Sequence, residues 1–148
     1  MRISVKGRYA LAAVTVIAQR AQSQENVTVS SISEELGLSK IYLEQVFSQL
    51  KRDGLLLSVK GPRGGYRLAR APSKITAWDV LTALESSLTE KTENTVGDSA
   101  PEIETALRSI VFGPLDDALR SRLSEITLRE ILDFSDKQRT QQAFMLNL

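Results

Sequence analysis

A glycine-rich loop carrying two cations is the first segment of this chain whose residue types suit chemistry. Lys60 and Arg63 stand at the tip formed by Gly61-Pro62-Arg63-Gly64-Gly65, between two short segments rich in Leu, Val and Tyr that predict a β-hairpin. Glycines let the backbone approach a phosphate or a narrow groove, and an arginine suits the negative minor groove of A-tract DNA. No helix with a Lys-Ser/Thr start follows, which argues against a Walker-type phosphate site.

The polar start of a helix is the second such segment. Ser39 is placed to cap a helix whose apolar face carries Leu43, Val46, Phe47 and Leu50. The residues that then point outward are Lys40, Ile41, Glu44, Gln45 and Ser48. In a recognition helix, N-terminal residues of this kind contact base edges, and Gln or Glu suits adenine or cytosine. A solvated helix face is the alternative interpretation.

The elements that must position this helix lie before it. An amphipathic first helix is predicted by the spacing of Ala10, Val14, Ile17 and Ala21. A short helix bearing Ile32 and Leu36 follows. Its start signals are Thr28, Ser30 and Ser31, with Glu34 placed to complete a capping box with Ser31. Gly37 suits a positive φ at its end, so the pattern is helix, tight turn, helix.

Composition excludes several classes of site. The 148 residues include no Cys and no His, which excludes disulfides, thiolate zinc sites, iron–sulfur ligation by the usual groups, and Ser-His or Cys-His catalysis. Residues 1–75 hold 12 Lys and Arg against 5 Asp and Glu, a net +7, whereas residues 76–148 carry a net −6. The basic half favours a polyanionic partner.

The chain start admits two interpretations. Met1 to Ala18 has the charged and apolar regions of a secretory signal, but Gln19 and Arg20 stand where cleavage requires small residues. The first helix is the interpretation that we favour. No apolar run reaches the ~18 residues of a membrane span. We therefore expect no membrane partner and a cytoplasmic location.

A helix-turn-helix followed by a basic hairpin is the winged-helix plan, and five ordered motifs resemble the Rrf2 family of bacterial transcription regulators. The motifs are Arg2-Ile-Ser-Val-Lys6-Gly7-Arg8-Tyr9-Ala10, Ile32-Ser-Glu-Glu-Leu-Gly37, Tyr42-Leu-Glu-Gln45, Leu50-Lys-Arg-Asp-Gly54-Leu55 and Gly61-Pro-Arg-Gly-Gly65-Tyr66. The resemblance is close over residues 1–88 and loose beyond them. It implies a dimer that reads an operator in double-stranded DNA, with the helix from Ser39 in the major groove and the hairpin in the minor groove.

The resemblance also implies roles for individual residues. Tyr42, Glu44 and Gln45 match base- and backbone-reading positions, and Lys60 and Gly61 match the tip of the wing. Arg2, Lys6 and Arg8 match basic residues near the phosphate backbone, whereas Lys40 and Ile41 stand where the family varies. Two alternatives remain open, because Tyr42 can pack on the first helix and Glu44 can pair with Lys40.

Cluster-binding members of the family place three cysteines and a further ligand after the fourth helix. The corresponding segment here, Ser86 to Ala100, contains no thiol. We therefore expect no cofactor and no metal, and a protein of the CymR type (cysteine metabolism) rather than the iron–sulfur IscR type. The resemblance to the CymR branch implies a cysteine-synthesis enzyme as a sensing partner.

The chain beyond the hairpin predicts helices. Thr76 to Glu85 is expected to form a fourth helix capped by Thr76, in which Trp78 and Leu81 close the core. Thr127 is placed to cap a short helix that bears Leu128, Ile131 and Leu132. The apolar tail 141–148 docks across a dimer or onto a partner protein, or it frays.

A long amphipathic stripe after Pro101 predicts a dimerisation helix. Its apolar positions are Ile103, Leu107, Ile110, Val111, Leu115, Ala118, Leu119 and Leu123. A second copy is the expected partner, because two-fold dimers are the commonest oligomers and match inverted-repeat operators. Gly113-Pro114 is expected to bend or divide this arm, because proline removes a helix hydrogen bond.

These observations predict a mostly α protein with a small β-hairpin. Residues 1–85 form a winged-helix DNA-binding domain, 86–100 a flexible loop and 101–148 a helical dimerisation region. We expect a homodimeric repressor, with sulfur or cysteine metabolism as its implied field. A winged-helix protein-interaction module without specific DNA binding is the alternative. An enzyme is disfavoured because the carboxylates fall on helical arms and loops rather than in a rigid cleft.

Overall fold

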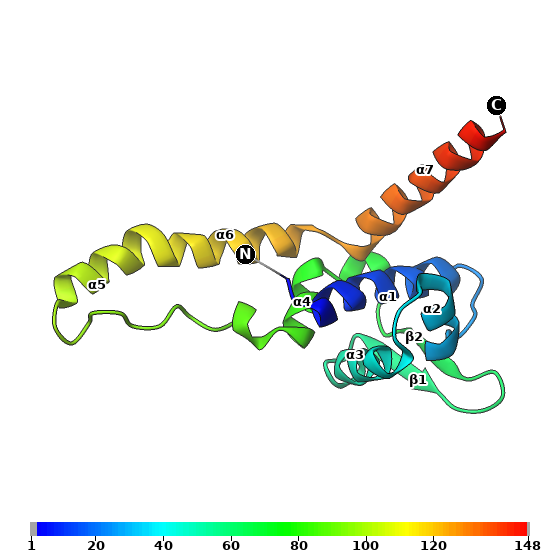
Figure 1. Ribbon diagram of the computed structural model, residues 1–148, viewed down its shortest axis with the longest axis horizontal. Coiled ribbons are helices and arrows are strands. Elements are labelled where there is room, and N and C mark those ends of the chain that lie inside the picture. Colours follow the sequence, from blue (N-terminus) through cyan, green and yellow to red (C-terminus); the bar gives the residue numbers. More distant parts are fainter. Residues whose placement is uncertain (1–2, 148) are drawn as a thin grey trace.

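The computed structural model describes residues 3–147 and shows a helical unit with a small hairpin, from which a helical arm extends (Figure 1). The helices are α1 (Val5–Ala21), α2 (Val29–Leu36), α3 (Lys40–Arg52), α4 (Ala77–Leu84), α5 (Pro101–Leu107), α6 (Gly113–Glu125) and α7 (Leu128–Leu146), and the strands are β1 (Leu56–Val59) and β2 (Gly65–Leu68). Short 3-10 turns span Pro72–Lys74 and Ser86–Leu88. The prediction of a mostly α winged-helix fold is confirmed.

Side-chain caps begin the helices of the helix-turn-helix. Ser39 precedes α3 and accepts a hydrogen bond from the Tyr42 amide at 3.4 Å, as predicted. Gly37 ends α2 with a φ of +65°, also as predicted. The prediction of a capping box between Ser31 and Glu34 is wrong, because α2 begins about one turn earlier than this box requires. Thr28 is the cap and accepts from the Ser31 amide at 3.1 Å.

The core forms around α1, which packs against α3, α4, α7 and β2. Its predicted apolar face is buried at Ala10, Val14 and Ile17, but Ala21 is exposed because the helix ends there. The four predicted apolar residues of α3 are fully buried, so the opposite face of that helix is its exposed face.

The wing is an antiparallel hairpin in which Leu56 pairs with Leu68 and Val59 with Gly65. Two backbone hydrogen bonds join it to the segment before α2: the Val27 amide donates to the Tyr66 carbonyl at 2.8 Å, and the Tyr66 amide donates to the Val27 carbonyl at 2.7 Å. The Tyr66 ring also meets the Phe47 ring edge to face, with centroids 4.9 Å apart. The hairpin is thus held against both the segment before α2 and helix α3.

Helix α4 begins with a complete capping box. The Thr76 hydroxyl accepts from the Asp79 amide at 3.1 Å, and the Asp79 carboxylate accepts from the Thr76 amide at 2.9 Å. Leu81 is buried as predicted. Trp78 is not a core residue, because its half-buried ring borders a surface cavity and lies beneath the Arg120 guanidinium.

The arm remains helical through Gly113-Pro114. A π-helical segment, Arg108–Phe112, joins α5 to α6, and the Gly113 amide donates to the Arg108 carbonyl five residues earlier. The wider turn accommodates a proline, which has no N–H to donate to a preceding turn. A Cβ on residue 113 would lie 2.8 Å from the Arg108 oxygen, so this turn requires a glycine. The interruption predicted here is a π turn rather than a break.

Helix α7 is longer than the predicted short helix. Thr127 caps it as expected, accepting from the Glu130 amide at 3.2 Å, and Leu128 and Leu132 are buried near α1. The helix then continues for 19 residues in all and projects away from the domain (Figure 1). The apolar pattern ends at Leu132, which is why the sequence predicted an earlier end.

Gly65→Ala tests the attachment of the wing. Gly65 has a φ of +142°, and a Cβ there would lie 2.7 Å from the Val27 carbonyl oxygen. We expect Gly65→Ala to lose about 1–3 kcal/mol from backbone strain and more from the steric clash, measured by urea unfolding. Gly61→Ala is the control, since Gly61 has a φ of +104° with open space around it. Equal losses in the two variants would contradict this account.

Candidate nucleic-acid interface

Helix α3 and the hairpin lie on the same side of the domain (Figure 1), and the N-terminal half of α3 carries exposed side chains. Lys40, Ile41, Glu44 and Gln45 are all exposed, and Ile41 is exposed to 72%. An isoleucine so open to water, beside polar neighbours, is suited to a contact with a thymine methyl group. The face predicted from helical spacing is therefore free to meet another molecule.

Tyr42 differs from its neighbours because it packs on α1. Its ring meets the Tyr9 ring edge to face at a centroid distance of 5.6 Å, and the Lys6 ammonium lies 5.6 Å from the Tyr42 centroid. The structure therefore agrees with the alternative in which Tyr42 packs on the first helix. Arg8 is exposed one turn along α1, and Arg2 lies outside the described residues.

The other alternative, a Lys40–Glu44 pair, does not form. Within residues 3–147 the ion pairs join other side chains, such as Arg20 with Glu35 and Arg70 with Asp79. Each of the two residues on α3 is therefore available to an external partner.

The tip of the wing is exposed at Lys60, Gly61 and Arg63. The Asn26 side-chain amide donates to the Arg63 carbonyl at 2.9 Å, which fixes the backbone of the tip and leaves the guanidinium outside. Sequence reasoning missed Asn26 as a supporting residue. Asn26 directly precedes Val27, which pairs with the hairpin. The sequence alone does not predict that pairing, so it could not identify Asn26.

The loop after α4 is attached to the arm through Glu104, a residue on α5 that is only 7% exposed. Its carboxylate accepts from the Thr95 and Val96 amides at 3.0 and 2.9 Å. Arg108 donates to the same carboxylate at 3.1 Å and to the Thr92 carbonyl at 3.0 Å. The amide hydrogen bonds from Val96 and Thr95 lower the pKa of Glu104, and Arg108 adds to this effect.

An iron–sulfur cluster does not fit these residues. Iron–sulfur clusters are held mainly by thiolates, with imidazoles in some sites, and the whole sequence contains neither. Among residues 3–147, no group of three or more potential metal ligands comes together. The loop that could be compared with a ligand loop is instead held by a carboxylate and a guanidinium.

In the part of the chain that the structure describes, no helix is both long and apolar enough to span a bilayer.

Comparison with known proteins identifies relatives that match nearly the whole chain. The sequence model of the Rrf2 family, described as iron-dependent transcriptional regulators, matches residues 3–133. The transcriptional regulator IscR of Citrobacter koseri is 36% identical over 149 residues, covering 97% of this chain and 90% of the relative. These relatives are regulators and not enzymes, in agreement with the prediction.

Two solved structures are similar throughout. CymR, the global cysteine regulator of B. subtilis, has a TM-score of 0.73 and 30% identity, covering 90% of this chain and 98% of that one. IscR of T. potens has a TM-score of 0.70 and 33% identity, covering 93% and 90%. The expected resemblance to CymR is compatible with these matches, although IscR proteins are prominent among the sequence relatives.

The prediction of a cofactor-free protein is wrong as a general conclusion. It was drawn from the missing cysteines and histidines, yet the family is described as iron-dependent and relatives named IscR match the chain along its length. The missing residue types exclude one set of ligands. They do not show that the protein works without a cofactor.

The lowered pKa of Glu104 predicts how the loop responds to acid. An unfolded carboxyl titrates near 4.5, so the loop gains stability above that pH and loses it as the pH falls through the lowered pKa of the folded state. We expect the protection of the Thr95 and Val96 amides, measured relative to intrinsic exchange at the same pH, to fall only below pH 4.5. Glu104→Gln should accelerate exchange at neutral pH, and Glu93→Gln, an exposed residue of the same loop, should not. Full protection in Glu104→Gln would refute this role.

Proposed function

Because the chain belongs to the Rrf2 family of transcriptional regulators, we propose that it is a homodimeric repressor that reads an inverted-repeat operator. The start of α3 enters the major groove, and the wing enters the adjacent minor groove. The observation that carries this proposal is that α3 and the hairpin lie on the same side of the domain (Figure 1), while the start of α3 and the cationic tip of the hairpin are both exposed. The contact between the Phe47 and Tyr66 rings joins α3 to the hairpin.

Base reading belongs to α3 in this proposal. Gln45 and Glu44 offer hydrogen-bonding groups to base edges, and Lys40 and Ile41 give the operator preference that distinguishes this protein. Tyr42 contacts the DNA backbone through its hydroxyl, because its ring is held between Tyr9 and Lys6. A ring fixed in this way loses little conformational entropy on binding.

Backbone contacts come from two cationic groups. Lys60 and Arg63 approach the minor groove, where Gly61 brings the backbone close. Arg2, Lys6 and Arg8, at the start of the chain, approach the phosphates. The net charge of +7 over residues 1–75 supports this arrangement, since phosphate neutralisation supplies much of the affinity for DNA.

Dimerisation is assigned to the arm, residues 101–148, and the loop 86–100 joins it to the DNA-binding residues 1–85. Four large apolar side chains of the arm are open to water. These are Ile103 at 51%, Ile110 at 76%, Val111 at 46% and Leu115 at 56% exposure. Leu107, Leu119 and Leu123 are half-buried along the same arm. An apolar face of this length is covered best by an identical arm, which also supplies the two-fold axis that a palindrome requires.

Repression is the proposed outcome of this arrangement. A dimer that covers two half-sites on a promoter excludes the polymerase, and such a protein acts in the cytoplasm, where bacterial DNA lies. Sulfur or cysteine metabolism is the proposed field, supported by the similarity to CymR, the global cysteine regulator. A cysteine-synthesis enzyme is the proposed sensing partner. The exposed apolar end of α7, with Phe144, Met145 and Leu146 at 65–87% exposure, supports a contact with another protein.

Substitutions on the wing and on α3 separate the proposed roles. Lys60→Glu or Arg63→Glu should weaken binding to all sequences and reduce the salt slope by about 1 for each phosphate that is no longer neutralised. Gln45→Ala should instead cost about 1–3 kcal/mol of discrimination at one base pair. Lys74→Glu, a charge reversal at an exposed lysine outside the proposed DNA-binding and dimerisation residues, is the control. The measurement is fluorescence anisotropy across a salt series, and uniform losses in all three site variants would contradict the assignment.

Leu115→Glu tests the dimer. A carboxylate at the centre of the exposed arm face would be buried without a partner, so we expect association to weaken about 100-fold, equivalent to ~3 kcal/mol. Sedimentation velocity at several concentrations measures this change. Leu57→Glu, at a similarly exposed leucine on β1, should leave the association unchanged. A wild-type chain that sediments as a monomer at micromolar concentration would reject the proposed dimer.

A further inference from the structure

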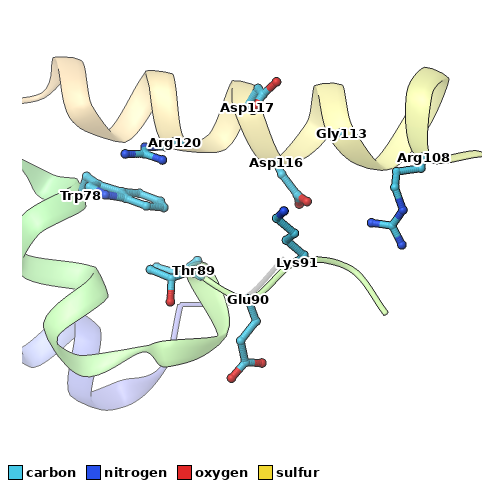
Figure 2. A pocket seen from close by; sticks show the side chains of 10 residues that line it. Trp78, Thr89, Glu90, Lys91, Arg108, Gly113, Asp116, Asp117 and Arg120 are labelled. Atoms are coloured by element: carbon cyan, nitrogen blue, oxygen red, sulfur yellow. The ribbon is translucent and has the colours of Figure 1, made fainter. Parts of the chain in front are cut away.

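A cavity of about 470 Å³ lies between the arm and the DNA-binding domain. Helix α6 forms one wall, Trp78 of α4 stands at one end, and residues 88–91 of the loop form the floor (Figure 2). Its volume lies in the range of small-molecule sites. Neither the DNA-reading face nor the exposed apolar face of the arm uses it.

The charges aimed into this cavity are mainly positive. Figure 2 shows Arg120, Lys91 and Arg108 extending into the space, and Asp116 pointing toward Lys91. The two other carboxylates of the lining, on Glu90 and Asp117, point away from it. Among the lining residues that the structure describes, three cations and one anion therefore face the interior. A ligand that carries negative charge is favoured there.

An aromatic ring lies beside this charge. The Arg120 guanidinium stands over the Trp78 ring, 5.7 Å from its centroid. Trp78 is half-buried, and Leu88 adds an apolar side chain to the lining. The end of the cavity thus combines an apolar surface with a guanidinium held by a cation–π contact, so that an anion can be bound while a planar group rests against the indole.

We propose that this cavity is an effector site for a small organic anion with a planar apolar body, such as an aromatic carboxylate or a nucleotide. The anionic group binds Arg120 and Lys91, and the planar body contacts Trp78. Arg108 contributes less, because its NH2 group already donates to Glu104 and to the Thr92 carbonyl. The ligand would contact the arm, the loop and α4 together.

The position of the cavity gives the site a regulatory consequence, which rests on the proposed function. Gly113, Asp116, Asp117 and Arg120 follow the i, i+3, i+4, i+7 spacing of one side of α6, whereas Leu115 lies on another side. A ligand can therefore enter without displacing the second arm. By joining Arg120 on the arm and Lys91 on the loop to Trp78 of the DNA-binding residues, it would fix the orientation of the arm relative to α4 and hence the separation of the two recognition helices in a dimer.

The cavity is largely formed before any ligand binds. Lys91 belongs to the loop that Glu104 and Arg108 hold through Thr92, Thr95 and Val96. The π segment, of a kind frequent at functional sites, brings Gly113 into the lining. The loop therefore loses little conformational entropy when a ligand binds, which favours measurable affinity for small probes.

The chain offers a direct readout, because Trp78 is the single tryptophan in the sequence. We would titrate the full-length protein with benzoate and with AMP while following tryptophan emission, and use benzamide, adenosine and acetate as matched controls lacking either the charge or the ring. The expected result is a saturable change in emission with benzoate or AMP, at a dissociation constant on the order of 1 mM or below for fragments of this size. The controls should give none. Which of the two probes binds separates a carboxylate from a phosphate ligand.

Substitutions locate the binding. Lys91→Gln leaves the contact between Arg120 and Trp78 in place and should weaken probe binding about tenfold, as should Arg120→Gln. Arg122→Gln, an exposed cation on the same helix outside the cavity, should not. Saturable binding that survives both substitutions, equal binding of benzamide, or no saturable change with any probe would each overturn the proposal.

The emission titration needs no DNA, so it fails or succeeds separately from operator binding. If the protein binds its operator but the emission does not respond, the effector site is wrong and the proposed function stands. If the emission responds as expected but no specific DNA is retained, the cavity binds anions and the proposed repressor function is wrong.

Discussion

The position of the hairpin beside α3 depends on the backbone pairing between Val27 and Tyr66. Two hydrogen bonds of 2.7 and 2.8 Å attach the hairpin to the segment before α2, and the Tyr66 ring rests edge to face on Phe47 of α3. A two-stranded hairpin is marginally stable alone, so without these contacts the wing would not hold its position beside α3. Gly65 is the residue that permits the approach, because any side chain there would meet the Val27 backbone.

The arm depends on a second backbone feature, the π turn from Arg108 to Phe112. It lets the helix pass Pro114 without a break, so that the exposed apolar side chains from Ile103 to Leu115 belong to one continuous element. The same turn brings Gly113 into the lining of the cavity that Trp78 borders. Arg108, which begins the turn, also binds Glu104 and the loop. The proposed dimer face, the attachment of the loop and the proposed effector site therefore share a short stretch of chain, and in the proposed dimer this stretch connects a bound effector to the spacing of the two α3 helices.

Much of the fold could be predicted from the sequence, because local chemistry determines it. Ser39, Gly37 and Thr76 act as helix boundaries through hydrogen bonds with near neighbours, and the buried face of α3 follows helical spacing. The errors concern contacts between distant segments or competing local signals. Thr28 rather than Ser31 caps α2, Trp78 faces a cavity, and Glu104 of α5 anchors a loop that the sequence predicts to be flexible. The absence of Cys and His correctly excluded thiolate and imidazole ligands but did not support the wider conclusion of a cofactor-free protein.

The central claim is that two linked winged-helix units read one operator, each through the start of α3 and through its wing. Hydroxyl-radical and methylation footprinting of DNA fragments that the purified protein retains from a fragmented bacterial genome tests it most directly. The account predicts an inverted repeat with two protected major-groove segments, separated by a whole number of helical turns of ~10.5 base pairs, each flanked by a protected minor groove. Protection of a single half-site, or a uniform pattern on all retained DNA, would contradict it.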